Sequence, residues 1–191
     1  MKTARIEQLQ TLHVAFGLVR DWSAAIDGGA NQGDWAAEMA SRFQNVYAFE
    51  PADDMAELCA RRFSDQKNVA VAHKALWNVK ASVSIHPPIG EPTKTLARYV
   101  QPGGDIDAVA IDDLGLPSCG LIKLDLEGAE LLALEGAIST LSRYRPVVIV
   151  ECKNRLLERF GASKKQLLEF LSDMGAREVH RLNPDRIFAW L

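Results

Sequence analysis

The stretch Ala24–Trp35 constrains the fold of this chain more than any other. Small and apolar residues run into an acid, Asp27, followed by the glycine-rich turn Gly28–Gly33 and by a helical pattern up to Phe43. A strand that ends in such a turn and continues as a helix presents backbone N–H groups to a ligand. Glycine permits the close approach of the backbone. The stretch therefore predicts a ligand-binding strand–turn–helix unit near the start of an α/β fold.

The order of the remaining patterns indicates the architecture. An amphipathic leading helix is expected within residues 1–22, and strand patterns then alternate with helical ones up to the strand Pro146–Val150. The segments Glu178–Arg181 and Arg186–Leu191 can close as an antiparallel pair. The alternation predicts an α/β fold with a doubly wound, mostly parallel sheet and a C-terminal antiparallel hairpin. We expect residues 1–191 to form a single domain.

Residues 77–120 interrupt the alternation. A third strand is expected at Val69–Leu76, and the alternation in Ser82–His86 favours an added antiparallel strand. Prolines and glycines make residues 87–105 the least regular part of the chain. Long loops in compact domains are often functional. We therefore expect residues 77–120 to supply an extra strand and a loop that either covers an acceptor or is a plain surface loop.

Composition excludes several classes of partner. The 25 acidic and 22 basic residues give a net charge of −3, which provides no general attraction to nucleic acid or to an anionic membrane. No apolar run approaches the roughly 20 residues that span a bilayer, and residues 1–8 lack the apolar core of a secretory signal. The three cysteines show no Cys-x-x-Cys spacing. A cytoplasmic protein without nucleic-acid or membrane partners is expected, and its oligomeric state stays open.

Polar residues follow the predicted strands at one edge of the sheet. Parallel strands end at the same edge, where ligands of such sheets bind. Glu50 ends the second strand about twenty residues after the glycine turn, the spacing at which an acid meets a ribose. The residues expected at this edge are Asp27, Glu50, Leu76–Asn78, Asp125 and Glu151.

The turn distinguishes between two nucleotide ligands. Dinucleotide sites use Gly-x-Gly-x-x-Gly, which rests a pyrophosphate on a helix N-terminus, whereas this chain has Asp27, Gly29, Asn31 and Gly33 at alternate positions. An acid at Asp27 would repel a diphosphate and suits a ligand with a cationic amino-acid end. S-adenosylmethionine is such a ligand. An NAD-dependent oxidoreductase remains the disfavoured alternative.

Several motifs resemble the FkbM family of S-adenosylmethionine-dependent methyltransferases over about residues 20–155. The similar segments are Ile26–Gly33, Tyr47–Pro51, Ile122–Glu130 with Leu134–Ala137, and Arg145–Glu151. The resemblance implies a Rossmann-like class I methyltransferase fold with S-adenosylmethionine as cofactor. It also implies cofactor contacts from Asp27, Gly29, Asn31, Gly33 and Glu50, the last on the ribose. Asn31 replaces a glycine of the general methyltransferase turn, and asparagine tolerates left-handed dihedrals.

Further cofactor contacts are expected from the same edge. They are Gly28, Pro51, Leu76, Trp77, Asn78 and Asp125. The family usually has an acid close to position 78, where this chain has Asn78, so the adenine contacts differ from the family pattern.

The segment Lys123–Glu130 carries the expected chemistry. Methyl transfer to a hydroxyl requires positioning of the two atoms and removal of a proton. Strand alternation places Lys123 and Asp125 on one side, the turn brings Glu127 and Glu130 close, and clustered carboxylates raise one another's pKa. These four are the candidate catalytic residues. Alternative bases are His73 and His86.

Two alternatives remain open on sequence alone. Glu127, Glu130 and Glu151 offer oxygen ligands that suit magnesium or calcium, although no metal is assigned. The expected function is O-methylation of a small-molecule or glycan acceptor. A non-catalytic S-adenosylmethionine-binding protein would carry the same motifs.

Overall fold

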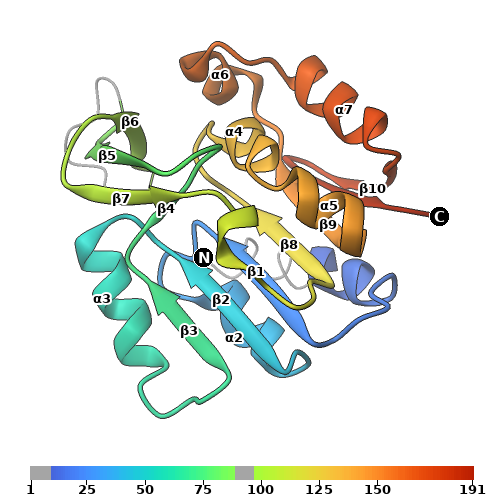
Figure 1. Ribbon diagram of the computed structural model, residues 1–191, viewed down its shortest axis with the longest axis horizontal. Coiled ribbons are helices and arrows are strands. Elements are labelled where there is room, and N and C mark those ends of the chain that lie inside the picture. Colours follow the sequence, from blue (N-terminus) through green and yellow to red (C-terminus); the bar gives the residue numbers. More distant parts are fainter. Residues whose placement is uncertain (1–9, 89–96) are drawn as a thin grey trace.

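A seven-stranded sheet forms the centre of the computed structural model, which describes residues 10–88 and 97–191 (Figure 1). Its strand order is β10-β11-β9-β8-β1-β2-β3. The five parallel strands are β1 (Ala24–Gly28), β2 (Asn45–Phe49), β3 (Val69–Ala72), β8 (Leu121–Leu124) and β9 (Val147–Glu151). The order reverses between β1 and β8, so their carboxyl ends form the switch point at which such sheets bind ligands.

The chain ends in the predicted antiparallel hairpin. Strand β11 (Asp185–Ala189) pairs antiparallel with β10 (Arg177–Leu182) and also with β9. The last strand therefore inserts between β9 and β10 instead of adding to the edge. This insertion brings the hairpin turn, Asn183–Pro184, beside the carboxyl end of β9.

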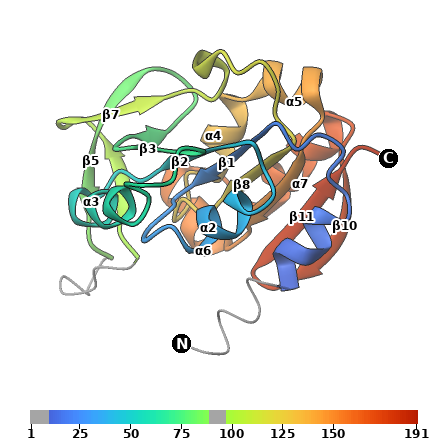
Figure 2. The same ribbon diagram turned by 90° about the horizontal axis from the view of Figure 1, so that it is seen from below.

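Helices cover both faces of the large sheet, as a doubly wound fold requires (Figure 2). Strand alternation creates the two cores: Ile26 and Val148 point to one face, and Ala25 and Ile149 to the other. Residues 10–16, α2 (Asp34–Ala40) and α3 (Asp53–Arg62) pack on the second face. The first face carries α4 (Glu130–Glu135), α5 (Ile138–Tyr144), α6 (Asn154–Leu157) and α7 (Lys164–Asp173).

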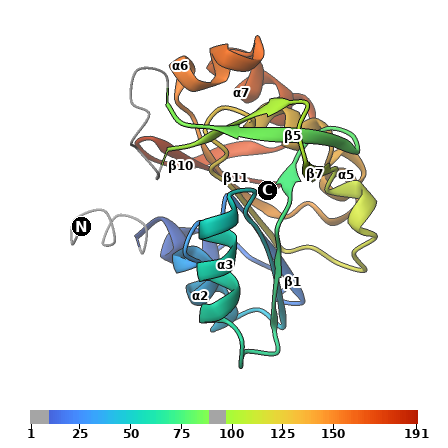
Figure 3. The same cartoon turned by 90° about the vertical axis from the view of Figure 1, so that its left-hand side faces the viewer.

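A smaller sheet stands against the large one (Figure 3). Its order is β4-β7-β5-β6, formed by Ala75–Leu76, Ile106–Val109, Ala81–His86 and Tyr99–Pro102. The antiparallel strand predicted at Ser82–His86 is confirmed as β5, which pairs antiparallel with both β6 and β7. Trp77, Val83 and Ala108 belong to a separate core beneath this sheet. Short 3₁₀ helices form at η1 (Asp112–Leu114) and η2 (Glu158–Phe160).

Two details of the sequence-based prediction were wrong. The single strand expected at Val69–Leu76 is two strands in two sheets, because the chain turns at His73–Lys74 and Ala75 pairs with Ala108. Residues 87–105 contain β6, although 89–96 lie outside the described residues. Between α4 and α5 lies Gly136, whose position leaves no room for a side chain: a Cβ there would lie 2.2 Å from the Trp77 carbonyl oxygen. The part of the expected leading helix before residue 10 also lies outside the described residues.

Candidate functional site

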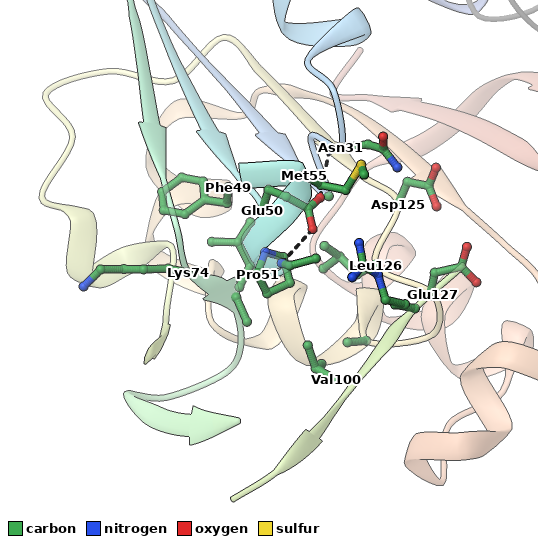
Figure 4. A pocket seen from close by; sticks show the side chains of 16 residues that line it. Asn31, Phe49, Glu50, Pro51, Met55, Lys74, Val100, Asp125, Leu126 and Glu127 are labelled. Carbon is green, nitrogen blue, oxygen red and sulfur yellow. Dashed lines mark hydrogen bonds between the residues drawn. The ribbon is translucent and has the colours of Figure 1, made fainter. Parts of the chain in front are cut away.

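A pocket lies between the two sheets, at the carboxyl ends of β1, β2 and β8 (Figure 4). The large sheet contributes the turn residues Gly29 and Asn31, the segment Phe49–Ala52 and the loop Asp125–Glu127. The small sheet contributes Ala75, Leu76 and Val100, and the segments that join the sheets add Lys74 and Arg98. We call this the first pocket. Of the predicted cofactor residues, it brings together Gly29, Asn31, Glu50, Pro51, Leu76 and Asp125.

Glu50 organises the glycine turn from the end of β2. One carboxylate oxygen, Oε2, accepts a hydrogen bond from the backbone N–H of Asn31 at 2.8 Å, and Oε1 accepts one from Ala52 at 2.9 Å (Figure 4). Burial raises the pKa of Glu50, while these two hydrogen bonds act in the opposite direction. Asn31 has the left-handed conformation that the sequence predicted, with φ 51°. Glu50 thus both shapes the turn and lines the pocket.

Gly29 is required by a close contact between β1 and β8. It has φ 71°, and a Cβ at this position would lie 1.9 Å from the Asp125 carbonyl oxygen. Its N–H group donates to the Phe49 carbonyl at 2.9 Å. Gly33 has φ 80° and precedes the first residue of α2. The turn therefore depends on glycine for its conformation and for its approach to the neighbouring loop.

Asp27 and Lys123 lie beneath the turn, buried between β1 and β8. The Lys123 Nζ atom lies 3.0 Å from Asp27 Oδ1, and it donates to the carbonyl oxygens of Gly28 at 3.1 Å and Gly29 at 2.9 Å. Burial alone would lower the pKa of Lys123, but Asp27 and Asp125 raise it. Because Lys123 balances the charge of Asp27, this acid does not by itself disfavour a diphosphate, contrary to the expectation from the sequence. The structure gives both residues a part in holding the turn.

Three carboxylates meet beside the turn. One side-chain oxygen from each of Asp125, Glu130 and Glu151 lies within 4.8 Å of the others. Glu130 Oε1 accepts the N–H groups of Leu126 at 2.8 Å and Gly128 at 3.2 Å, and burial raises the pKa of Glu130 to about 7. Burial and then Asp125 raise the pKa of Glu151. The structure thus brings Asp125 and Glu130 together as expected and adds Glu151 to them.

Glu127 lies on the wall of the first pocket (Figure 4). It has φ 54°, a conformation that is uncommon for a residue other than glycine and that clusters at functional sites. Burial, followed by the nearby charge of Asp125, raises the pKa of Glu127. The loop therefore holds Glu127 in place at some conformational cost.

A second pocket adjoins the first and shares Asp125 with it. Its wall is formed by Trp35 and Lys123 on one side, by Glu151 and Lys153 at the end of β9, and by the hairpin turn 182–185. The Lys153 Nζ atom lies 2.6 Å from Glu151 Oε1. Sequence reasoning missed Lys153 and the hairpin turn. The only signal for Lys153 was its position two residues after the acid that ends β9.

Other predicted site residues have different surroundings. Trp77 packs on Phe160 beneath the small sheet, with ring centroids 5.7 Å apart, and Asn78 Nδ2 donates to Glu135 Oε2 at 3.3 Å. Gly28 packs against Leu76, since a Cβ there would lie 2.8 Å from Leu76 Cδ1. The alternative base His73 lies 2.8 Å from Asp53 Oδ1. The other, His86, contacts the Ser84 hydroxyl at 2.9 Å.

Comparison with known proteins gives a family match over most of the chain. Residues 27–178 match the model of the Methyltransferase FkbM domain. A comparison with curated protein sequences gave no match. Within the described ranges 10–88 and 97–191, every helix is too short or too polar to cross a membrane.

Solved structures share the fold. The FkbM methyltransferase from Methylobacillus flagellatus KT is 21% identical, with a TM-score of 0.60, over 92% of this chain and 45% of that one. Precorrin 8W decarboxylase from Methanobacterium thermoautotrophicum is 18% identical, with a TM-score of 0.56, over 96% and 89%. N-methyltransferase NodS from Bradyrhizobium japonicum WM9, in complex with S-adenosyl-l-homocysteine, is 11% identical, with a TM-score of 0.56, over 97% and 84%. The chain thus spans about half the length of the first structure. The shared fold confirms the predicted fold class.

Proposed function

The chain belongs to the FkbM methyltransferase family, and from this premise we propose that it methylates a hydroxyl group of a small molecule or glycan. Its methyl donor is S-adenosylmethionine. The proposal concerns the acceptor and the residues that act on it. The observation that carries it is the junction at Asp125, which lines both pockets and belongs to the carboxylate cluster.

The first pocket suits the cofactor. Glu50 borders it at the end of β2, where a carboxylate can accept hydrogen bonds from the ribose hydroxyls. Met55, Leu76 and Val100 add apolar surface for a base. The turn at Gly29 and Asn31 lies on the same wall and offers close approach of the backbone to the amino-acid end. With the cofactor in this pocket, its methyl group would point toward the junction.

The second pocket suits the acceptor. The hydroxyl oxygen attacks the methyl carbon in line with the sulfonium, the carbon–sulfur bond breaks, and the electron pair stays on sulfur. The hydroxyl proton passes to a carboxylate of the Asp125–Glu127 loop. Carboxylates and Lys153 border this pocket, and such groups hydrogen-bond a polyhydroxyl compound well. A hydroxyl acceptor is therefore favoured over an apolar one.

Two measurements test the proposal in sequence. Calorimetric titration with S-adenosylhomocysteine and with NAD is expected to show binding of the first alone. Release of methyl groups is then measured over a panel of glycans and small hydroxyl compounds, and turnover with at least one of them is expected. Binding without turnover on any acceptor would favour the non-catalytic alternative. Binding of NAD in place of S-adenosylhomocysteine would refute the cofactor site.

The variant Asp125→Asn tests the role that we propose for Asp125 at the junction. It keeps the size of the side chain and removes its charge, so turnover should fall at least about 100-fold, the scale of a proton-transfer contribution, with little change in affinity for S-adenosylhomocysteine. Glu169→Gln on α7, with an exposed side chain, is the matched control and should behave as the wild type. Unchanged turnover in Asp125→Asn would remove this residue from the mechanism.

A further inference from the structure

The three clustered carboxylates come from three different elements. Asp125 follows β8, Glu130 begins α4 and Glu151 ends β9, and their oxygens converge within 4.8 Å. Glu130 is 1% exposed, and its Oε1 atom is held by two backbone N–H groups. The backbone of the loop therefore fixes the orientation of the Glu130 carboxylate. Such convergence of three carboxylates, two of them buried, is electrostatically costly unless positive charge compensates it.

Glu151 provides an independent observation at this cluster. Its side chain is 7% exposed, and Oε1 pairs with Lys153. Its other oxygen, Oε2, is fully buried and has no hydrogen-bond partner among residues 10–88 and 97–191. A buried carboxylate oxygen without a partner is unfavourable and calls for a bound group.

Two lysines near the cluster each form an ion pair with one carboxylate. Lys123 is balanced by Asp27 at 3.0 Å and donates to two turn carbonyls. Lys153 forms its ion pair with Glu151 Oε1, and its side chain is 46% exposed. Among the described residues, neither lysine therefore forms an ion pair with Asp125 or Glu130, whose oxygens lie beside Glu151.

We propose that Asp125, Glu130 and Glu151 bind one divalent cation of the Mg²⁺ or Mn²⁺ type at the junction of the two pockets. All three donors are carboxylate oxygens, which hard cations prefer. Three protein ligands leave coordination positions for water and for an acceptor hydroxyl, as is usual for Mg²⁺. Asp125 is the least buried of the three and opens to both pockets, so a hydroxyl can reach the site.

A bound cation would give the carboxylates different roles in the reaction. This part of the proposal rests on the proposed hydroxyl acceptor. A hydroxyl on a divalent cation loses its proton more readily. Asp125 then acts as a ligand, and Glu127, which lines the first pocket outside the cluster of three, is left to take the proton. The ligand set also differs from Glu127, Glu130 and Glu151, the oxygen ligands considered from the sequence.

Binding of Mn²⁺ to the full chain tests the site without cofactor or acceptor. After treatment with a chelator and its removal, the chain is titrated with Mn²⁺ while the electron paramagnetic resonance signal of the free ion is recorded. One site per chain is expected, with Mg²⁺ competing. Glu151→Gln and Asp125→Asn should each weaken binding at least about tenfold. The exposed-residue control Glu169→Gln should leave it unchanged.

Circular dichroism confirms that each variant is folded. If Glu151→Gln does not fold, Asp125→Asn alone provides the test. No saturable binding by the wild type at millimolar Mn²⁺ would overturn the site, as would wild-type affinity in both Glu151→Gln and Asp125→Asn. Titration with S-adenosylhomocysteine is run in parallel. If it binds while Mn²⁺ does not, the cation site fails and the proposed function stands; the reverse result refutes the cofactor pocket and leaves the cation site intact.

Discussion

Lys123 and Asp27 form a buried ion pair across neighbouring strands, with Nζ 3.0 Å from Oδ1 and both side chains at most 3% exposed. Asp27→Ala leaves the Lys123 charge buried and unpaired. We expect the free energy of unfolding to fall by about 3–5 kcal/mol, measured by urea denaturation. From the sequence, a cofactor contact was expected of Asp27, whereas the structure pairs it with Lys123 beneath the turn.

The double variant Asp27→Ala/Lys123→Met supplies the control. Because it removes both charges, it should lose less stability than the two single variants added together. The residual loss reports the two hydrogen bonds from Lys123 to the glycine turn. Wild-type stability in Asp27→Ala would contradict the ion pair.

Gly29→Ala should distort the turn. The new Cβ would fall 1.9 Å from the Asp125 carbonyl oxygen, so one of the two segments must move, at a cost of about 1–3 kcal/mol beyond that of the backbone conformation. Affinity for S-adenosylhomocysteine should fall more than about tenfold, which corresponds to 1.4 kcal/mol. Calorimetry and urea denaturation give the two values.

Gly161→Ala is the matched control for Gly29→Ala. Gly161 also has a left-handed φ, 70°, but its Cβ would meet no atom within 4 Å among the described residues. The loss should be about 1–2 kcal/mol, the cost of the left-handed conformation, with unchanged ligand affinity. Equal behaviour of the two variants would show that contact with Asp125 is unimportant.

Glu50→Ala should weaken binding of S-adenosylhomocysteine. The substitution leaves the N–H groups of Asn31 and Ala52 without their acceptor, and each unpaired buried group costs about 1–3 kcal/mol. A decrease in affinity of at least about tenfold is expected by calorimetry. Glu57→Ala, on the exposed side of α3, should bind as the wild type does. Equal affinities in the two variants would remove Glu50 from the cofactor site.

Asp112 caps α5 from a distant loop and should make stability depend on acid pH. Its carboxylate accepts the N–H groups of Ser139 and Thr140, each at 2.8 Å. Although partial burial would raise the pKa of Asp112, these hydrogen bonds lower it below the ordinary 3.8. The stabilisation is therefore complete above that pH and is lost as the pH falls through the lowered pKa.

Urea denaturation of wild type and Asp112→Ala at several pH values checks this cap. The variant should lose about 1–2 kcal/mol at pH 7, and the difference should shrink toward pH 3. A difference that is constant with pH would show that the carboxylate charge plays no part.

Periodicity predicted the parallel strands, the flanking helices and the hairpin, since each depends on local alternation of apolar residues. It could not divide Val69–Leu76, an almost continuous apolar run without a proline or glycine to mark the turn at His73–Lys74. It also could not pair Asp27 with Lys123. Those residues are partners only because the register of β1 and β8 places them side by side, and register depends on the whole sheet.

The site was predictable where it depends on strand ends. Asp125, Glu50 and Glu151 were expected at one edge because parallel strands end together. The second pocket could not be predicted in this way, because its wall includes the turn at Asn183–Pro184. That turn reaches the site only because β11 inserts between β9 and β10, an arrangement that a hairpin pattern alone does not specify.

Ala75 and Leu76 belong to the small sheet but close a pocket whose other wall belongs to the large one. A molecule in that pocket therefore binds only when the two sheets are docked, and its binding free energy adds to the free energy of docking. Ligand affinity and the separation of the sheets are then linked equilibria. Amide hydrogens of β4 and β7 should therefore exchange more slowly when S-adenosylhomocysteine is bound, although β7 does not line the pocket.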